Sequence, residues 1–447
     1  MELIHTILVK ISDFLWGIPL LVTLIGTGLY LTFILGFVQF RYLFKALKMV
    51  FMPPKDKTHP GDISHFQALM TALAATVGTG NIAGVAIAIA MGGPGAMFWM
   101  WMTGMVGMAT KYSEAVLGIR YRIILPNGSI AGGPMYYIEK GLKSKAWALS
   151  FAIFTSIAAF GTGNMIQSNS VAEAINGAFG ISNYICGFIL AFLAGVVIIG
   201  GIKSIGRVTQ VLVPVMIVCY MVVGLTAILM NLELFPAAAL SIFSHAFTGE
   251  AVFGGFVGVG IKQALRFGLA QGLLSNESGL GSSPIAAAAA RTDHPVTQAL
   301  ISMTQTFIDT IVVCSMTGFI IIMSHSSDGI TTGAKLTALS FNTLLNTDIG
   351  SLLIALGLSV FAYSTILGWS YYGEIAMEYI FGLKVIKYYR IIFVTFVFLG
   401  SIVRLEMVWT FSYVMNALMA LPNLIALLFL SGEVKRLHKE YIGKTSL

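Results

Sequence analysis

Charged residues are scarce in this sequence. Asp, Glu, Lys and Arg make up only 10% of the 447 residues, whereas 57% are hydrophobic and the mean hydropathy is +0.87. Ordinary soluble domains carry roughly 25% charged residues, so the composition excludes a soluble protein and indicates a polytopic membrane protein. The apolar stretches continue for about 20 residues without alternating polar positions, which predicts membrane helices and excludes a β-barrel.

Cysteines are few, and the sequence motifs of common enzyme classes are lacking. The three cysteines, Cys186, Cys219 and Cys314, each fall within an apolar segment, which suits small packing residues better than a disulfide framework. The seven histidines show no metal-ligand spacing, and HExxH, GxSxG and aspartate-rich diphosphate motifs are missing. We therefore expect no catalytic residue, no enzymatic activity and no resident metal or other cofactor.

Apolar windows predict eleven transmembrane helices. Their expected ranges are 14–38, 65–91, 95–119, 147–177, 183–200, 208–230, 251–280, 296–323, 350–378, 389–403 and 407–430. Nearly all Lys and Arg between these spans fall on one side, against Lys10, Lys335 and Arg404 on the other. The positive-inside rule then places the chain in a prokaryotic cytoplasmic membrane, with its N-terminus outside and its C-terminus in the cytoplasm. This bias accounts for the net charge of +7 without a nucleic-acid partner.

Two of these spans are interrupted by glycine. One contains "GTGNIAG" at 78–84, and the other is the glycine-rich stretch 254–282. Each interrupted span is the first of five consecutive transmembrane spans. Because five is an odd number, the second set of five spans starts from the opposite side of the membrane. Paired interrupted spans in inverted halves are typical of secondary transporters. We expect an extra N-terminal transmembrane helix and cytoplasmic loop (1–63), a first five-helix repeat (64–230), a second, inverted repeat (251–430) and a cytoplasmic tail (431–447).

The physical reason for such a break is the chemistry of the backbone. In lipid, unwound backbone persists only where protein, water or a ligand supplies hydrogen-bond partners. Freed carbonyls can coordinate a cation, and the amides that begin the next half-helix can bind a carboxylate, so an amino acid that travels with sodium would use both. Alternatively, the glycines only allow close helix packing. The matching second break favours the ligand site.

Three separated stretches carry a family resemblance. "VGTGNIAGVAIAIAMGGPGAMFWMW", "GGPMYYIEKGL" and "SNESGLGSSPIAAAAA" together strongly resemble the alanine/glycine:cation symporter family, over about residues 64–432. The resemblance implies a carrier for small neutral amino acids, coupled to sodium or in some members to protons, on a leucine-transporter-like fold. The sequence departs from the family at Ser278 and Gln271, where Ala and Arg are usual, and at Ala288, where many members have His.

The fold implied is all-α, with about eleven transmembrane helices in a leucine-transporter-like 5+5 inverted repeat and one extra N-terminal helix. The resemblance also implies a sodium site in which the first broken helix and the eighth core helix meet. Its expected ligands are the carbonyls of Ala74, Val77 and Phe361 and the hydroxyls of Ser364 and Thr365. An all-oxygen shell suits a hard cation. Alternatively, these hydroxyls only bond back to carbonyls of their own helix.

The expected substrate-binding residues are Gly78, Thr79, Gly80, Asn81, Gln167, Phe267, Gly268 and Trp369. Residues 78–81 form the first break, where amides and side-chain donors are expected to bind the carboxylate. Gln167 is expected to accept from the substrate ammonium or, alternatively, to make an interhelical hydrogen bond. We place the second break around Phe267 and Gly268, and we expect Phe267 to face Trp369 across a pocket whose bulk favours alanine and glycine.

Charged residues within or beside spans are functional candidates because their insertion is costly. Such residues are Asp309, Lys262, Arg266 and Glu277. Arg266 is expected to pair with Asp309 or Glu277, either as a pair that shifts during transport or as a static brace.

The sequence as a whole predicts a secondary active symporter that imports alanine and glycine with sodium by alternating access. Alternatives are a proton-coupled carrier of the same fold and an ion channel, although the two dissimilar breaks are unlike the repeated loops of a selectivity filter. The expected partners are the amino acid, the sodium ion and the lipid bilayer, without nucleic acid or an obligate protein partner.

Overall fold

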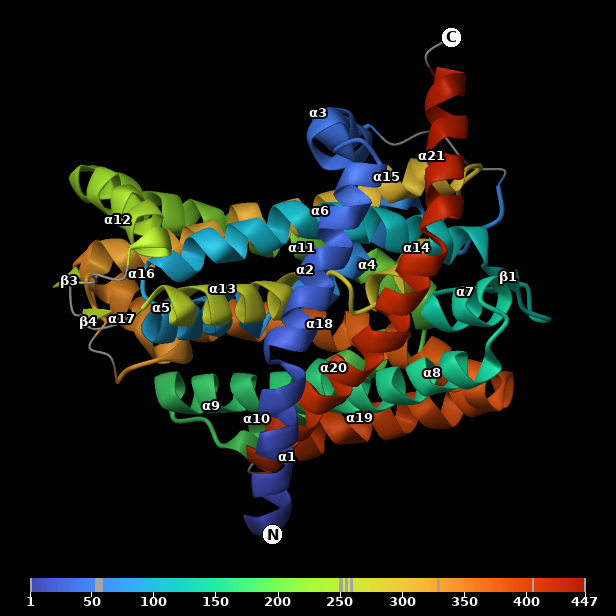
Figure 1. Cartoon of the computed structure of the whole chain (residues 1–447). Helices are drawn as coiled ribbons and strands as arrows, with labels where there is room; N and C mark the ends of the chain where they lie inside the picture. Colours follow the sequence, from blue (N-terminus) through green and yellow to red (C-terminus); the bar gives the residue numbers. More distant parts are fainter. Residues whose placement is uncertain are drawn as a thin grey trace.

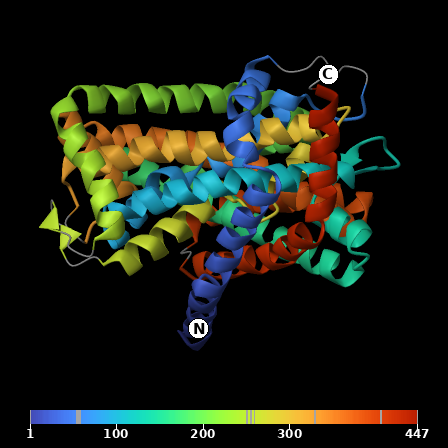
Figure 2. The ribbon, with the colours of Figure 1, turned by 45° about the horizontal axis from the view of Figure 1, so that its top comes forward.

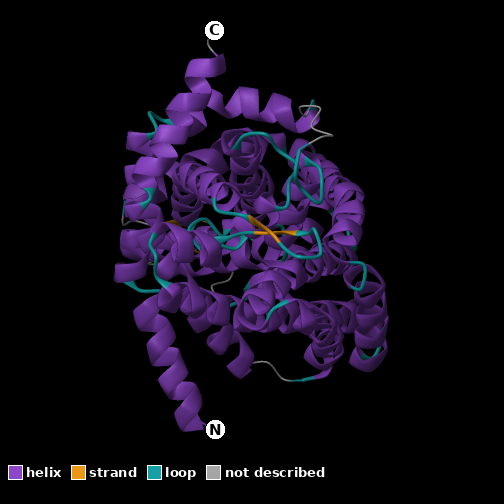
Figure 3. Cartoon of the chain, turned by 90° about the vertical axis from the view of Figure 1, so that its right-hand side faces the viewer, coloured by secondary structure: helices purple, strands orange, loops and turns teal. Residues whose placement is uncertain are grey.

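The chain folds into a bundle of helices. The computed structural model describes residues 2–52, 59–248, 252–253, 256–257, 260–327, 330–403 and 406–445. Within these residues the only strands form two short antiparallel hairpins, β1 (Ile123–Ile124) with β2 (Ile130–Ala131) and β3 (Val252–Phe253) with β4 (Phe256–Val257). They lie at opposite ends of the bundle (Figure 1), and helices joined by loops make up the rest (Figure 3). The predicted all-α class is confirmed.

Membrane-spanning helices dominate the described part of the chain. Seven segments are long and apolar enough to cross a bilayer, or eight if a bent pair, His65–Thr76 and Gly80–Gly92, counts as one span. The seven are Thr6–Ile34, Lys145–Phe179, Gly201–Leu229, Pro295–Ser324, Gly350–Phe381, Leu383–Ile402 and Met407–Phe429. The expected number of eleven stays a prediction.

Three helices precede the first expected repeat. They are α1 (Glu2–Leu15), α2 (Ile18–Ile34) and α3 (Val38–Phe51). In Figures 1 and 2, α1 and α2 cross the long axis of the bundle steeply. They pack on helices from both halves of the chain, α2 on α6 and α1 on α20.

The expected first repeat begins with a bent helix. Its elements are α4 (His65–Thr76), η1 (Gly80–Gly84), α5 (Val85–Gly92), α6 (Gly95–Arg120), α7 (Pro134–Gly141), α8 (Lys145–Phe160), η2 (Gly161–Met165), α9 (Ile166–Phe179), α10 (Asn183–Ile198) and α11 (Gly201–Leu229). Ser64 and Gln67 form a reciprocal capping box that fixes the start of α4. The chain bends by 52° between α4 and the η1–α5 segment, at the expected first break.

The second half is likewise built of long and short helices. After η3 (Leu232–Leu234) and α12 (Phe235–Phe247) it contains α13 (Ile261–Asn276), α14 (Ser283–Ala288), α15 (Pro295–Thr306), η4 (Phe307–Cys314), α16 (Ser315–Ser324), α17 (Gly333–Leu345), α18 (Gly350–Phe381), η5 (Leu383–Val385), α19 (Ile386–Ile402), α20 (Glu406–Phe429) and α21 (Ser431–Thr445). α6 packs on α13 and α15, and α18 packs on α4, α8 and α9. The division into inverted repeats at 64–230 and 251–430 stays a prediction.

The expected position of the second break is wrong. α13 runs through Phe267 and Gly268 without interruption. Gly268 is needed for close packing, because a Cβ built there would lie 2.4 Å from the carbonyl oxygen of Ala96 on α6. The chain unwinds after Asn276 instead, where Glu277 has φ +56° and Gly279 has φ +91°. Of the expected span 251–280, residues 251, 254, 255, 258 and 259 lie outside the described part of the chain, as does Arg404.

Candidate functional site

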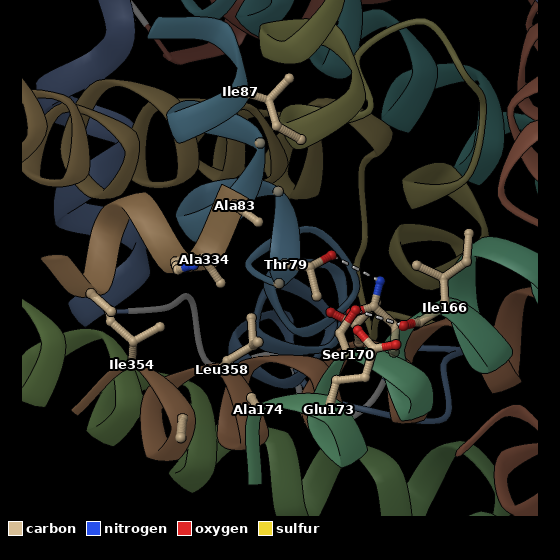
Figure 4. A pocket seen from close by; sticks show the side chains of 18 of the residues that line it. Thr79, Ala83, Ile87, Ile166, Ser170, Glu173, Ala174, Ala334, Ile354 and Leu358 are labelled. Carbon is tan, nitrogen blue, oxygen red and sulfur yellow. Dashed lines mark hydrogen bonds between the residues drawn. The ribbon is translucent and has the colours of Figure 1, made fainter. Parts of the chain in front are cut away.

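The first break borders a cavity of about 780 Å³. Gly78, Thr79 and Gly80 line it together with residues of α9 and α17, and Figure 4 shows Thr79 with Ser170 and Ala174 of α9 and Ala334 of α17. The expected site residues that line this cavity are Gly78, Thr79, Gly80, Gln167, Thr365 and Trp369. The remaining residues expected to bind substrate, Asn81, Phe267 and Gly268, are not part of its lining.

Gln167 lines the cavity and carries an unpaired hydrogen-bond acceptor beside the first break. Its Nε2 donates to the carbonyl oxygen of Thr162 at 3.1 Å and to the Thr79 hydroxyl at 3.3 Å. Because a carbonyl only accepts, the amide nitrogen must face Thr162, which leaves Oε1 on the other side. This oxygen is buried and has no partner among the described residues. An unpaired buried acceptor is costly, so the site is suited to a ligand that donates hydrogen bonds.

Oxygen atoms converge where α18 meets the end of α4. The Ser364 hydroxyl donates to the carbonyl oxygen of Phe361 at 2.7 Å and to that of Ala74 at 3.2 Å. The Thr365 hydroxyl donates to Phe361 at 3.1 Å. Both hydroxyls therefore bond back to a carbonyl of their own helix, as the alternative reading expects. Ser364 in addition donates to a carbonyl of the first broken helix. Val77, the fifth expected sodium ligand, is the C-cap of α4 and precedes the break directly.

Asn81 does not line the cavity but braces the first break. Its Oδ1 accepts from the backbone N–H of Gly78 at 2.9 Å, and its Nδ2 donates to Oδ1 of Asp309 at 2.8 Å. The other oxygen of Asp309 accepts from the hydroxyls of Ser275 and Thr310, both at 3.0 Å. These bonds fix the shape of the unwound segment and connect it to η4 and α13.

The expected ion pairs of Arg266 are wrong. Arg266 is exposed on α13, with Nη2 3.5 Å from Oδ1 of Asp13 on α1. Asp309 is buried among the neutral donors described above, and Glu277 accepts from the Trp369 indole at 2.9 Å and from the Ser282 hydroxyl. The sequence shows the spacing of these charges along the chain, but it does not show which side of α13 Arg266 faces. Lys262 is also exposed on this helix.

A buried polar network surrounds the second break, and the sequence did not reveal it. Oε1 of Glu114 on α6 accepts from the N–H groups of Gly279 and Gly281 and from the side chain of Asn423 on α20. Lys111, one turn earlier on α6, is buried and donates to Ser283 at 2.9 Å. The signal available was a Lys and a Glu three residues apart within an apolar span. The side chains of Glu114 and Lys111 thus provide hydrogen-bond partners for backbone and side-chain groups in and beside the second break.

Trp369 forms one wall of the cavity, and Gly163 in η2 makes room for it. A Cβ built at Gly163 would lie 2.2 Å from the Cβ of Trp369. Gln271 and Leu274 of α13 line the cavity, whereas Phe267, expected in this role, does not. The wall of α13 is therefore formed one to two turns after the expected residue.

Comparison with known proteins gives the family. The model of the sodium:alanine symporter family matches residues 1–446. The chain belongs to the sodium:alanine symporter family. Within this family, the sodium/alanine symporter AgcS of Methanococcus maripaludis is 53% identical over 432 residues, which cover 95% of this chain and 94% of that protein. The amino-acid carrier protein AlsT of Bacillus subtilis is 37% identical over 437 residues, which cover 96% and 90%.

Solved structures show the fold of this symporter. The crystal structure of MhsT in complex with L-phenylalanine has a TM-score of 0.53 at 13% identity and covers 83% of this chain and 89% of that one. A manganese transporter from Eremococcus coleocola has a TM-score of 0.50 at 14% identity and covers 83% and 80%. The expected leucine-transporter-like fold is confirmed. The protein is a prokaryotic membrane symporter and not an enzyme.

Proposed function

We propose that the protein carries small neutral amino acids, alanine and glycine first, together with sodium ions by alternating access. The observation that carries this proposal is that an unpaired acceptor and a pair of hydroxyl groups both lie at the first break. The unpaired Oε1 of Gln167 and the hydroxyl pair Ser364 and Thr365 both lie against residues 74–80. The names of the relatives, a sodium/alanine symporter and an amino-acid carrier, agree with this chemistry.

The amino acid would bind at the cavity side of the first break. Gln167 Oε1 would accept from the ammonium group. Thr79 and Gly80 begin the η1–α5 segment, and amides at the start of a helix favour a carboxylate. Trp369, Gln271 and Leu274 would surround the side chain. A longer side chain must displace one of them, and overpacking of this kind costs typically about 1–3 kcal/mol.

Sodium would bind beside the substrate, between α4 and α18. Ala74, Val77 and Phe361 would supply carbonyl oxygens, and Ser364 and Thr365 would supply hydroxyls. When sodium binds, the hydroxyl hydrogens that now point at the carbonyls of Ala74 and Phe361 must turn away, so that every oxygen faces the ion. Hard cations prefer such an all-oxygen shell. By linkage, each ligand raises the affinity for the other by the same factor.

The orientation follows from the distribution of charge. Lys335, in the first turn of α17, lines the cavity, and the positive-inside rule assigns this residue to the exterior. The N-terminus would then lie outside and the C-terminus in the cytoplasm, and this conformation would be the one that receives substrate from outside.

The test is uptake of labelled alanine into proteoliposomes. We expect accumulation under an inward sodium gradient and its loss in the Ser364→Ala/Thr365→Ala double variant. Ser370→Ala is the matched control, because this buried hydroxyl on α18 bonds only within its own helix, to Leu367, in the described hydrogen bonds. Accumulation driven equally by a proton gradient without sodium would overturn the choice of ion. No uptake of alanine or glycine at all would overturn the choice of substrate, and single-channel currents would overturn the carrier.

A further inference from the structure

One polar side chain of the cavity has no hydrogen-bonding role in the proposed binding of carboxylate, ammonium and sodium. Gln271 of α13 lines the cavity and is half-buried, and its amide has no hydrogen-bond partner among the described residues. Two residues that follow it in the sequence also line the cavity. Leu274 is apolar, and Glu277 already accepts one bond at each oxygen, from Trp369 and Ser282. This wall therefore offers a ligand one unused amide.

The position of Gln271 relative to the first break follows from two glycine contacts. A Cβ built at Gly80 would lie 3.4 Å from the Cα of Ser275, and a Cβ built at Gly84 would lie 3.1 Å from Oε1 of Gln271. The η1–α5 segment and α13 therefore lie side by side and run antiparallel. Gln271 thus lies one turn farther along the η1–α5 segment than its first residue, about 5.4 Å in an ideal helix.

The η1–α5 segment itself supplies only apolar groups beyond the break. Its residues in the cavity lining are Gly80, Ala83, Gly84 and Ile87, and Figure 4 shows Ala83 and Ile87 following Thr79. Because Gly84 has no side chain, the amide of Gln271 can lie against the backbone there. A substrate whose carboxylate binds at Thr79 and Gly80 would therefore have an apolar wall on one side and the amide of Gln271 on the other.

Glutamine at position 271 also distinguishes this chain, because arginine is usual there in the family. An arginine is always charged and only donates hydrogen bonds, whereas a glutamine amide is neutral and both donates and accepts. A hydroxyl group likewise donates and accepts, so it can pair with either end of the amide. The ligand chemistry that fits this wall is a short, neutral side chain that carries a hydroxyl.

We propose that Gln271 recognises the substrate side chain and extends the substrate class to amino acids with a hydroxyl on the β-carbon, serine first. This inference rests on the proposed function, because it takes the positions of the carboxylate and the ammonium group from it. Alanine remains a substrate. Gln271 is only half-buried, so a water molecule can take the place of the hydroxyl when alanine is bound.

The sharpest comparison is between serine and α-aminobutyrate, in which a methyl group replaces the hydroxyl at nearly the same size. The methyl group would displace water from the amide of Gln271 without offering it a hydrogen bond, which is unfavourable. The wild-type protein should therefore prefer serine to α-aminobutyrate. A purely apolar pocket would prefer α-aminobutyrate, so the order of the two substrates reports a polar contact and not the available space.

The experiment measures kcat/KM for uptake of labelled serine, α-aminobutyrate and alanine into proteoliposomes under an inward sodium gradient. Gln271→Met keeps the length of the side chain and removes its hydrogen bonds. The ratio of serine to α-aminobutyrate should fall by roughly 2- to 13-fold in this variant, the effect of one neutral hydrogen bond. The matched control is Gln263→Met, the same substitution two turns earlier on α13, at an exposed residue that does not line the cavity. It should leave the ratio unchanged.

Three results would overturn the role of Gln271. They are a wild-type preference for α-aminobutyrate, a ratio that Gln271→Met leaves unchanged, and an equal fall in the ratio in Gln263→Met. If Gln271→Met does not yield monodisperse protein, Gln271→Leu should give a fall of the same size, and an unchanged ratio in that variant would equally overturn the proposal.

Failure of the proposed function gives a different result. If wild-type protein accumulates none of the three amino acids, the assignment of substrate is wrong, and the role of Gln271 is wrong with it. If alanine accumulates with sodium but the ratio of serine to α-aminobutyrate does not depend on Gln271, only the role of this residue is overturned and the symport stands.

Discussion

The indole Nε1 of Trp369 donates a hydrogen bond of 2.9 Å to Oε1 of Glu277. Trp369 belongs to the cavity wall, and Glu277 is the first residue of the second break. The other oxygen of Glu277 accepts from Ser282, at the far end of that break. This carboxylate therefore links a side chain of the cavity wall with both ends of the unwound segment.

Trp369→Phe should lower both stability and apparent alanine affinity. The ring remains, but one oxygen of the buried Glu277 loses its donor, which costs about 1–3 kcal/mol. Glu277→Gln tests the pairing, because the two residues are in contact and a double-mutant cycle should give a coupling of about 0.5–3 kcal/mol. The measurements are thermal unfolding in detergent and the concentration dependence of uptake. Additive effects of the two substitutions would show that the bond carries no coupling.

Gln167→Leu should raise the KM for alanine with little effect on folding. The substitution removes the unpaired Oε1 and the bonds from Nε2 to Thr79 and to the carbonyl of Thr162. Loss of one hydrogen bond to a charged group corresponds to about 1.5–3 kcal/mol, or roughly 10- to 150-fold in KM. Ser170→Ala is the matched control: Ser170 lines the same cavity on α9, but its hydroxyl bonds to Ile166 of its own helix. Equal kinetics of the Leu and wild-type proteins would remove Gln167 from the substrate site.

Gly163→Ala should impair uptake and lower the stability of the fold. The added methyl group would lie 2.2 Å from the Cβ of Trp369, a clash that rotation of the indole does not relieve, so η2 and α18 must move apart and the cavity wall is displaced with them. We expect a loss of uptake that is steeper for alanine than for glycine. Gly177→Ala, at the outer part of the same cavity, is the control because a methyl group there meets nothing within 4 Å. An identical loss for both substrates would indicate damage to the fold rather than to the pocket.

The sequence predicts the first break well and the second one poorly. "GTGN" combines flexible residues with an asparagine that can satisfy the freed backbone, and the structure uses Asn81 in that way at Gly78. Near the second break, Gly268 and Gly272 serve contacts with α6 instead. The residue with left-handed backbone conformation that ends α13 is Glu277. A search of the sequence for glycines does not predict a break at a glutamate. A sequence does not distinguish a glycine that faces a neighbouring helix from one that unwinds its own.

A similar limit applies to the polar residues of the site. Gln167, Ser364 and Thr365 stand out because each interrupts an apolar span, and the structure brings all three to the first break. The partners of Glu114 are not visible in this way, because Asn423 lies 309 residues along the chain. Only the packing of α6, α20 and the second break creates that cluster.

The last prediction concerns pH and the C-terminal helix. Glu433, in the first turn of α21, accepts hydrogen bonds from Arg436 at 2.7 and 3.0 Å and from Arg120 of α6 at 3.1 Å. These bonds, those of Arg436 above all, hold the pKa of the Glu433 carboxyl below its usual value of 4.5. A lowered folded-state pKa gives a stabilisation that is complete above the unfolded-state value and is lost as the pH falls through the folded-state value.

We therefore expect Glu433→Gln to lower the Tm at pH 7 by only about a degree, since exposed ion pairs contribute little. This difference from wild type should vanish as the pH falls below 4.5, because protonation then removes the same carboxylate. Lys435→Gln, on the same helix, should show no such convergence. Thermal unfolding of both variants between pH 7 and pH 3.5 would measure it. A difference that persisted at the lowest pH would mean that Glu433 stabilises α21 by packing rather than through its charge.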